Sequence, residues 1–432
     1  MFRLRLVYLV LDGAADRLRD EVTSYAQARK SFLNLLARAG KCGMMYTVGE
    51  GVAPESDEAV LSILGYDPHK YYTGRGPIEA VGAGINFRER WEVAFRANFA
   101  TVDPRTGRLL DRRVGRSLST EEAAELAKAL DGLTLESHGG YVKFRSTVGH
   151  RAVAVLGSKE TPLSPHVENV DPAYRRSGLI SIAVKEFEPR IRECVPLDSS
   201  KEARITAELV NEFVRKAIEI LDEHPVNKER ERKGLLKANA VLLRDAGNEL
   251  PPTPKVREKY GLTFGSVTEM PVEKGIAKIL GMISKEMPPP SDDKEKNYSD
   301  RVEATLNLLE RADVVYVHLK GPDEPGHDGD LEGKVRSIEL IDQYYVKPLL
   351  SSIDLSEVAL LITSDHATPP SVRAHTDDPV PVVVVGGDIE PDSVLTLTEK
   401  CCSEGSLGIY QHGWEVLPEI LHLLGLKKDG VL

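Results

Sequence analysis

Carboxylate and imidazole side chains gather in three short segments toward the C-terminal end of the sequence. They are Asp323-Glu-Pro-Gly-His327, Asp365-His366 and His375. Carboxylate oxygen and imidazole nitrogen are the donors that divalent transition metals take from proteins. The proline and glycine inside the first segment favour a shaped loop in which its aspartate and histidine point at one ion. The same residue types also make ordinary surface loops, so this segment is moderate evidence by itself.

The second and third segments each have an alternative. Asp365-His366 follows an apolar run that ends at Thr363, and adjacent residues of a strand point to opposite faces. Both side chains are therefore ligands only where the chain turns, or where two ions lie side by side. Asp365 as the N-cap of a helix is the competing interpretation. His375 precedes another apolar run, and a single histidine there is more often a loop residue than a ligand.

Two N-terminal segments complete a possible site. Asp12-Gly13 follows a buried-looking apolar run, although Asp-Gly is also a common turn. Ser56 precedes a predicted helix that runs to Leu64, where plain N-capping is the alternative. At a helix N-terminus beside a metal, the dipole and the cation would both favour a serine alkoxide as nucleophile. If all five segments meet in space, the chain carries a two-metal phosphoryl-transfer site.

The pattern of apolar runs and helices around these residues predicts an α/β fold. Non-alternating apolar runs predict strands covered on both faces, as in parallel sheets: Leu6–Leu11, Val241–Leu243, Val314–Val317, Val358–Ile362 and Val380–Val385. Helices are predicted at Ser31–Ala39, Val272–Met282, Asp300–Arg311 and Gly333–Leu349, the last with an apolar stripe of Val335, Ile338, Ile341 and Tyr345. In parallel sheets functional loops gather at the carboxyl ends of strands. Asp12, His318–Asp323 and Asp365 all lie just past a predicted strand, which favours one shared site.

The middle of the chain has a different pattern. Between residues 87 and 200 it predicts the short strands Val93–Val102, Tyr141–Ser146 and Ala152–Leu156 with the helix Thr120–Leu130. We therefore expect an inserted α+β subdomain at 87–200, in a discontinuous core of residues 1–86 and 201–432. The helical stretch Glu202–Asp222 is expected to return the chain to that core. Pro288–Lys296, with three prolines and a charge run, is the expected flexible loop.

Bulk properties exclude several classes of protein. The chain has 432 residues, 41% of them hydrophobic and 28% charged, which favours a folded core over disorder. A net charge of −11 argues against a nucleic-acid partner. The apolar run before Asp12 is too short for a signal core or a membrane span, and no segment approaches the roughly 18 apolar residues of a transmembrane helix. Four cysteines without metal spacing fit a reduced compartment, so we expect a soluble, cytoplasmic protein without a membrane partner.

Longer segments resemble one family over nearly the whole chain and in the family's order. Besides Leu11–Gly13, Ser56-Asp57 and Leu64–Pro68, they are Thr73–Ala80, Phe95–Asp103, Asp111–Arg116, Lys320–Gly329, Thr363–Pro369, His375–Pro381 and Gly405–Gly408. The chain resembles the archaeal-type cofactor-independent phosphoglycerate mutases, a branch of the alkaline phosphatase superfamily. The resemblance implies an alkaline-phosphatase-like core with helices on both faces of a mostly parallel sheet.

The resemblance also implies a chemistry. Similar enzymes interconvert 3-phosphoglycerate and 2-phosphoglycerate through a phosphoserine, with two divalent ions, usually Mn²⁺ (Co²⁺, Zn²⁺ or Mg²⁺ being possible), and without 2,3-bisphosphoglycerate. Carried over by position, one ion takes Asp323, His327 and His375, and the other takes Asp12, Asp365, His366 and the nucleophile Ser56. Substrate would be bound by basic residues, with Arg96 and Arg116 favoured because they lie in matching segments. The full candidate set is Arg96, Arg112, Arg113, Arg116, Arg151, Arg244 and Lys320.

Some positions depart from the family pattern. From the nucleophilic serine onward the family usually reads Ser-Asp-Thr-Ala-His, whereas residues 56–60 of this chain read Ser-Asp-Glu-Ala-Val. The differing residues are Glu58 and Val60. Arg244-Asp245 stands where the family generally has Arg-Gly, and Ala14–Asp16 also differs. None of these changes removes a metal ligand. They leave open two alternatives, a phosphatase or phosphotransferase acting on another small phosphoester, and a catalytically silent metal-binding relative.

Overall fold

The apolar run that precedes Asp12 forms the central strand of a large sheet. The computed structural model describes residues 4–184, 186–288 and 291–426. In it, β1 (Arg5–Leu11) pairs in parallel with a strand on each side, β12 (Val314–Leu319) and β13 (Val358–Thr363). Every residue of β12 and β13 is buried, as expected for strands covered on both faces.

The sheet has eight strands and is mostly parallel. Its order is β11 (Ile283–Glu286), β10 (Phe264–Thr268), β12, β1, β13, β14 (Val380–Val385), β2 (Lys41–Met45) and β15 (Gly408–Tyr410). Only β14 runs antiparallel to its neighbours β13 and β2. The predicted α/β fold class is therefore confirmed, with β14 as the exception to the parallel arrangement.

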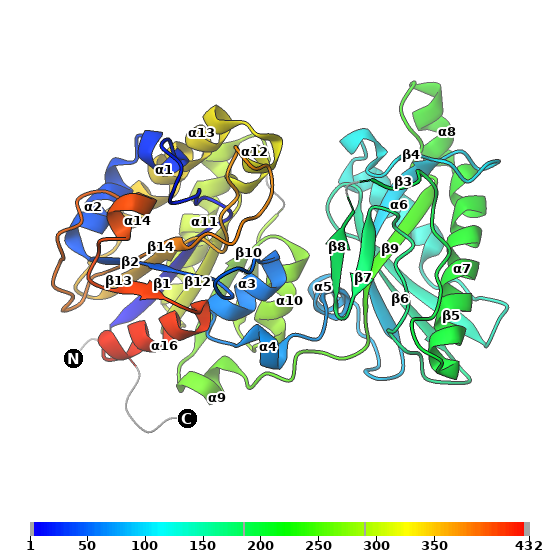
Figure 1. Ribbon diagram of the computed structural model, residues 1–432, viewed down its shortest axis with the longest axis horizontal. Helices are drawn as coiled ribbons and strands as arrows, with labels where there is room; N and C mark the ends of the chain where they lie inside the picture. Colours follow the sequence, from blue (N-terminus) through cyan, green and yellow to red (C-terminus); the bar gives the residue numbers. More distant parts are fainter. Residues whose placement is uncertain (1–3, 185, 289–290, 427–432) are drawn as a thin grey trace. The chain divides into compact units, whose positions relative to one another are not determined.

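Helices cover both faces of this sheet (Figure 1), with α2, α11 and α13 on one side and α3 and α16 on the other. Their bounds are α2 (Ser31–Ala39), α11 (Lys294–Leu309), α13 (Leu331–Ile341), α3 (Ser56–Ile63) and α16 (Gly413–Leu423). Shorter helices are α1 (Ser24–Gln27), α4 (Pro68–Tyr71), α9 (Val256–Tyr260), α12 (Asp323–Asp328), α14 (Lys347–Ser352) and α15 (Glu399–Cys402). The hydroxyl of Tyr8 on β1 donates to the carbonyl of Ile63 at 3.1 Å, which ties α3 to the sheet.

The helix predicted over Gly333–Leu349 contains an irregularity. It is built from α13, a π-helical turn η2 (Asp342–Val346) and α14. Ile338, Ile341 and Tyr345 are fully buried, as the apolar stripe predicts. Val335 is only half-buried, and Lys334 beside it is fully buried instead.

A second compact unit comprises residues 73–251 and 270–275, and the sheet just described belongs to the first. The second unit has an antiparallel sheet of β4 (Leu109–Asp111), β3 (Val93–Val102), β6 (Arg151–Ser158) and β5 (Gly140–Ser146), with β9 (Ala240–Gly247) paired to β3. It also contains α5 (Arg75–Gly82), η1 (Val114–Arg116), α6 (Thr120–Leu130), α7 (Lys201–Asp222), α8 (Pro225–Arg232) and the hairpin of β7 (Tyr174–Ser177) and β8 (Ile180–Ala183). Helix α10 (Pro271–Ile279) contributes to both units.

Contacts divide the chain at 72/73 and 251/252, whereas the sequence places the boundaries at 86/87 and 200/201. The second boundary differs because Val241–Leu243 is part of β9, which pairs with β3 and not with the parallel sheet. The first differs because α5 packs on β3 and β9. Helix α7 likewise packs on β9, so it does not return the chain to the larger core. Short apolar runs look alike in both kinds of sheet, and the pairing partner decides which unit a strand joins.

Two further expectations concern loops and membranes. The loop expected at Pro288–Lys296 lies partly outside the described residues, and its last residues begin α11 at Lys294. Among the described residues, no helix combines the length and the apolar character needed to cross a bilayer.

The core of the second unit yields a stability prediction. Phe213 on α7 is fully buried and lies 6.0 Å from the ring of Phe144 on β5. We expect Phe213→Ala to lower the free energy of unfolding by about 3–5 kcal/mol, since it leaves a cavity in a packed core. Denaturant unfolding measures the loss. Phe187→Ala, at an exposed phenylalanine, is the control and should cost far less.

Candidate metal centre

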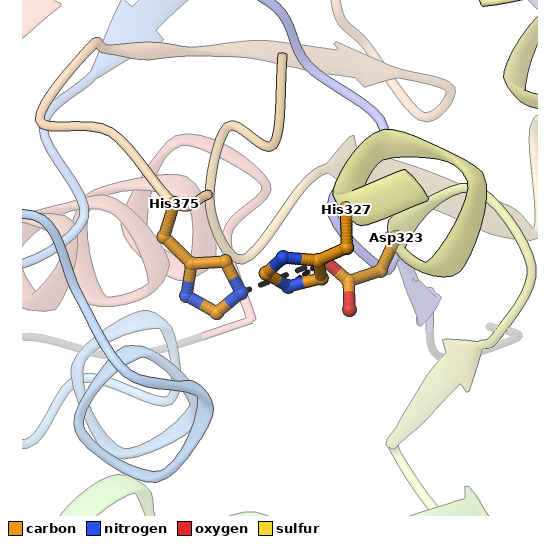
Figure 2. A group of neighbouring side chains, drawn as sticks. All are labelled: Asp323, His327 and His375. Carbon is orange, nitrogen blue, oxygen red and sulfur yellow. Dashed lines mark ion pairs between the residues drawn. The ribbon is translucent and has the colours of Figure 1, made fainter. Parts of the chain in front are cut away.

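The first group of ligand donors is carried by α12. Asp323 is the first residue of this short helix and His327 lies one turn later, so both side chains project from one face. Nε2 of His327 lies 3.4 Å and Nε2 of His375 lies 3.5 Å from Oδ1 of Asp323 (Figure 2). The shaped loop predicted here is therefore wrong: Pro325 sits in the first turn, where a helix tolerates it because its missing N–H has no intrahelical partner.

The second group is buried. Asp12 follows β1, and Asp365-His366 follows β13, the neighbouring strand. Nε2 of His366 lies 3.2 Å from Oδ2 of Asp365 and 3.6 Å from Oδ1 of Asp12. No helix begins within residues 364–379, all of which the structure describes, so Asp365 is not an N-cap. The chain turns here, as two adjacent ligands require.

The two groups adjoin each other. The rings of His366 and His375 are stacked with centroids 3.7 Å apart, and Nδ1 of His366 lies 3.9 Å from Oδ1 of Asp323. Within each group, one donor atom from every residue lies within 4.8 Å of the others. The six predicted carboxylate and imidazole ligands are thus brought together in the divisions that the resemblance implies.

All three histidines are held by Nδ1 and turn Nε2 toward the carboxylates. Nδ1 lies 2.8 Å from the carbonyl of Pro54 in His375, 3.3 Å from the carbonyl of Arg373 in His327, and 2.9 Å from Oγ1 of Thr368 in His366. A carbonyl can only accept, so in His375 and His327 the nitrogen Nδ1 carries a proton, and Nε2 is the nitrogen that faces Asp323. Such outer hydrogen bonds fix the ring orientation of metal-binding histidines.

The buried polar atoms of the second group fit a cation. Oδ2 of Asp365 and Nε2 of His366 lie 3.2 Å apart, yet neither makes a hydrogen bond of normal geometry among the described residues. A buried polar atom without a hydrogen-bond partner costs free energy, and coordination to a metal ion removes that cost. Two carboxylates and an imidazole are a donor set that Mn²⁺, Co²⁺ or Zn²⁺ accepts.

Electrostatics also favour ionised carboxylates. Burial raises the pKa of Asp323, but the imidazoles of His375, His366 and His327 outweigh it and hold that pKa well below its usual range. Burial likewise opposes ionisation of Asp365, and His366 and His318 outweigh it and lower its pKa. Asp323 and Asp365 therefore stay ionised, which is the form that binds a metal.

Ser56 opens α3 beside the first group. The N-cap of α3 is Glu55, which makes no side-chain capping bond, so Ser56 is the first helical residue and the N-cap alternative is wrong. Pro54, two residues earlier, accepts the hydrogen bond from His375. Val60 is fully buried, so the departure from histidine there places an apolar side chain in the protein interior. Burial and the charges of Asp57 and Glu55 raise the pKa of Glu58 to about 7.

Lys320 and His318 contact the second group. Nζ of Lys320 lies 3.2 Å from Oδ2 of Asp12, and Nε2 of His318 lies 3.5 Å from Oδ2 of Asp365. Burial and Lys320 oppose protonation of His318, but Asp365 and Asp12 raise its pKa to about 9. Sequence reasoning gave His318 no role and placed it just past the predicted strand Val314–Val317, whereas the structure places it inside β12. A histidine in a run that is otherwise buried was the available signal.

The candidate substrate arginines lie in the second unit. Arg244 and Arg112 both pair with the buried Asp171, at 3.2 Å and 2.6 Å, and Arg96 lies 3.5 Å from Glu79. Arg112, Arg113 and Arg116 line a hollow of about 390 Å³. Arg151 begins β6.

The sequence analysis did not identify two basic neighbours of these arginines, Arg75 and His150. Arg75 pairs with Glu79 at 2.7 Å and its charge lowers the pKa of Arg96, an effect second only to burial. His150 is surrounded by positive charge, since burial and then Arg151, Arg113, Arg244 and Arg96 lower its pKa to about 3. Arg75 lies in the matching segment Thr73–Ala80, which was the available signal.

Comparison with known sequences gives matches over almost the whole chain. Residues 37–227 match the profile of the family described as 2,3-bisphosphoglycerate-independent phosphoglycerate mutase. The chain is 47% identical over 426 residues to the enzyme of that name from Aeropyrum pernix, covering 98% of this chain and 100% of the relative. It is 41% identical over 427 residues to the corresponding Archaeoglobus fulgidus enzyme 1, covering 98% of both chains.

Two solved structures are also similar to the chain over almost its whole length. The cofactor-independent phosphoglycerate mutase from Thermoplasma acidophilum is 31% identical, with a TM-score of 0.61 over 98% of this chain and 100% of that one. A Pyrococcus horikoshii protein is 27% identical, with a TM-score of 0.77 over 99% of both chains.

A glycine substitution tests the closeness of the two ligand groups. A Cβ at Gly13, whose φ is +59°, would lie 2.7 Å from Oδ1 of Asp323 and from Oγ1 of Thr368. We expect Gly13→Ala to displace Asp323 and weaken binding of Mn²⁺ by about tenfold or more, measured by calorimetric titration. Gly261→Ala is the control, because its φ of +66° carries the same backbone strain with no neighbouring atom within 4 Å. Equal Mn²⁺ affinity in the two variants would contradict this geometry.

Proposed function

Because the chain belongs to the 2,3-bisphosphoglycerate-independent phosphoglycerate mutases, we propose that it interconverts 3-phosphoglycerate and 2-phosphoglycerate through a phosphoserine on Ser56. One observation carries this proposal beyond family membership. Two adjoining groups of carboxylate and imidazole donors lie at the ends of neighbouring strands, and α3 opens with Ser56 next to the segment that holds His375.

Seven residues are proposed to hold two divalent ions. Asp323, His327 and His375 hold one, and the other takes the second ligand group together with Ser56. Mn²⁺ is the proposed metal, since mixed carboxylate and imidazole sites without thiolate suit it. Bound ions would lower the pKa of the Ser56 hydroxyl and offset the negative charge of the phosphoryl group.

The proposed reaction has two matched transfers. In the first, Oγ of Ser56 loses its proton and attacks phosphorus, the bond from phosphorus to the glycerate oxygen breaks, and that oxygen takes up a proton. In the second, the other glycerate hydroxyl gives up its proton and attacks the phosphoserine, and Oγ of Ser56 leaves. No oxidant or additional phosphate donor is consumed. Lys320, whose Nζ lies 3.2 Å from Oδ2 of Asp12, is proposed to balance negative charge during both transfers.

Substrate binding is assigned to the arginines of the second unit. Guanidinium groups bind carboxylate and phosphate with two parallel hydrogen bonds. Asp171 pairs with both Arg112 and Arg244, and in a cation–π contact Cζ of Arg244 lies 4.1 Å from the ring centroid of Tyr174. Such support orients a guanidinium before substrate arrives. The cytoplasm, where phosphoglycerates occur, is the proposed location.

Replacing the nucleophile tests the mechanism. We expect Ser56→Ala to abolish interconversion in an assay coupled to enolase, because no other hydroxyl on α3 takes the proposed position. Ser62→Ala is the matched control: it removes a hydroxyl from the same helix that donates to the carbonyl of Thr47 instead. Removing metal with a chelator should also abolish activity, and adding Mn²⁺ should restore it.

Two results would contradict the mutase proposal. The first is release of inorganic phosphate from 3-phosphoglycerate or from other phosphoesters without interconversion, which would favour the phosphatase alternative. The second is activity that is insensitive both to Ser56→Ala and to chelation.

Arginine substitutions test substrate binding. Arg96→Gln and Arg116→Gln should each lower kcat/KM by roughly 10–100-fold, mainly through KM, since a charge-assisted hydrogen bond contributes about 1.5–3 kcal/mol. Arg232→Gln is the control, because Arg232 is exposed on α8 and pairs with Glu229. Steady-state kinetics with 3-phosphoglycerate measure the effect. An unchanged KM in both variants would remove these two residues from the proposed binding site.

A further inference from the structure

Thr368 links the two groups of metal ligands. It is fully buried in the loop after β13. Its hydroxyl donates to Oδ1 of Asp323 at 2.7 Å, and the same oxygen lies 2.9 Å from Nδ1 of His366. A hydroxyl has one proton, and that proton goes to the carboxylate, which can only accept. The oxygen is therefore left to accept from Nδ1–H of His366, so Nε2 is the nitrogen that His366 turns toward Asp12 and Asp365.

Two glycines leave room for this side chain. A Cβ at Gly13 would lie 2.7 Å from Oγ1 of Thr368, and a Cβ at Gly326 would lie 2.9 Å from Cγ2 of Thr368 and 2.4 Å from its carbonyl oxygen. Gly13 directly follows Asp12, and Gly326 lies between Asp323 and His327. Thr368 thus packs against both ligand-bearing segments at distances that only glycine permits.

The backbone of Thr368 is also held on both sides. Its N–H donates to the carbonyl of Ala15 at 3.1 Å, and its carbonyl accepts from Nζ of Lys334 at 2.9 Å. Lys334 is fully buried, and its other two protons go to the carbonyl of Ala15 at 2.9 Å and Oδ1 of Asp16 at 2.6 Å. One ammonium with every donor satisfied therefore joins the loop after β1 to the loop after β13.

We propose that Thr368 is a positioning residue that couples the two metal sites, with its hydroxyl orienting Asp323 for one ion and His366 for the other. This inference rests on the two-ion site proposed above. It follows that loss of one hydroxyl weakens binding of both ions together, although Thr368 belongs to neither ligand group. Lys334 acts one step farther out, by fixing where that hydroxyl lies.

Isosteric substitution tests the role. Thr368→Val keeps the shape and removes the hydroxyl, whereas Thr368→Ser keeps the hydroxyl. Calorimetric titration of the metal-free chain with Mn²⁺ should show two ions in the parent and in Thr368→Ser, and both ions bound at least about tenfold more weakly in Thr368→Val. The visible absorption of the Co²⁺-loaded chain should change in Thr368→Val and keep the parent spectrum in Thr368→Ser.

Thr305→Val is the matched control. Thr305 is a fully buried threonine on α11 whose hydroxyl donates to the carbonyl of Arg301 and lies 2.9 Å from the hydroxyl of Tyr345. Its loss therefore tests the effect of removing a buried, hydrogen-bonded hydroxyl outside the two ligand groups. Parent-like Mn²⁺ binding by Thr368→Val would overturn this proposal and leave the mutase function intact. A parent chain that binds no Mn²⁺ would overturn both. If circular dichroism shows Thr368→Val unfolded, Thr368→Ser against Thr368→Ala gives the same comparison, and equal affinities there overturn the proposal.

Discussion

The parallel pairing of β1 with β12 and β13 is the constraint on which the metal centre depends. Leu11 pairs with Leu319, and Val10 pairs with Thr363, so the three strands end at nearly the same level. Side chains just beyond them are then neighbours whatever their separation in sequence. An antiparallel strand in the place of β12 or β13 would send its following loop to the opposite edge. The sheet fixes where the ligands lie, and the loops need only turn them inward.

Burial sets a second requirement, because charged groups below the surface must be paired. Three kinds of hydrogen bonding meet that requirement. The histidines are anchored through Nδ1, and Oδ1 of Asp365 accepts from the N–H groups of Gly13 and His366. Lys334 donates to three acceptors. Each of these groups has its orientation restricted before any ion or substrate binds. Little reorganisation is then needed during the reaction, which is the condition under which electrostatic stabilisation contributes most to catalysis.

Much of this arrangement could be predicted from residue types and spacing. The α/β fold and the convergence of Asp12, Asp323 and Asp365 were predictable, because buried parallel strands are continuous apolar runs and their carboxyl ends share an edge. The unit to which β9 belongs could not be predicted, since its sequence does not indicate its pairing partner. The roles of Lys334 and Thr368 could not be predicted either. A lysine beside an apolar stripe indicates an exposed position, and a threonine shortly after Asp-His is typical of a loop. Their roles come mainly from distant partners: 34 residues separate Lys334 from Thr368, and 45 separate Thr368 from Asp323.

The division of the chain into two units has a consequence for how the protein folds. Residues 73–251 form a unit with its own apolar core, and this segment interrupts the sequence of the larger unit between α4 and α9. The central strand β1 must find β12 and β13 across that interruption, and such distant pairing slows folding. Closure entropy grows only with the logarithm of loop length, so the inserted segment adds little to the equilibrium cost. If the insert folds first, its ends are already held within one compact body, and the search for strand partners becomes shorter. The order of folding, more than the final stability, is then where a long insertion exerts its influence.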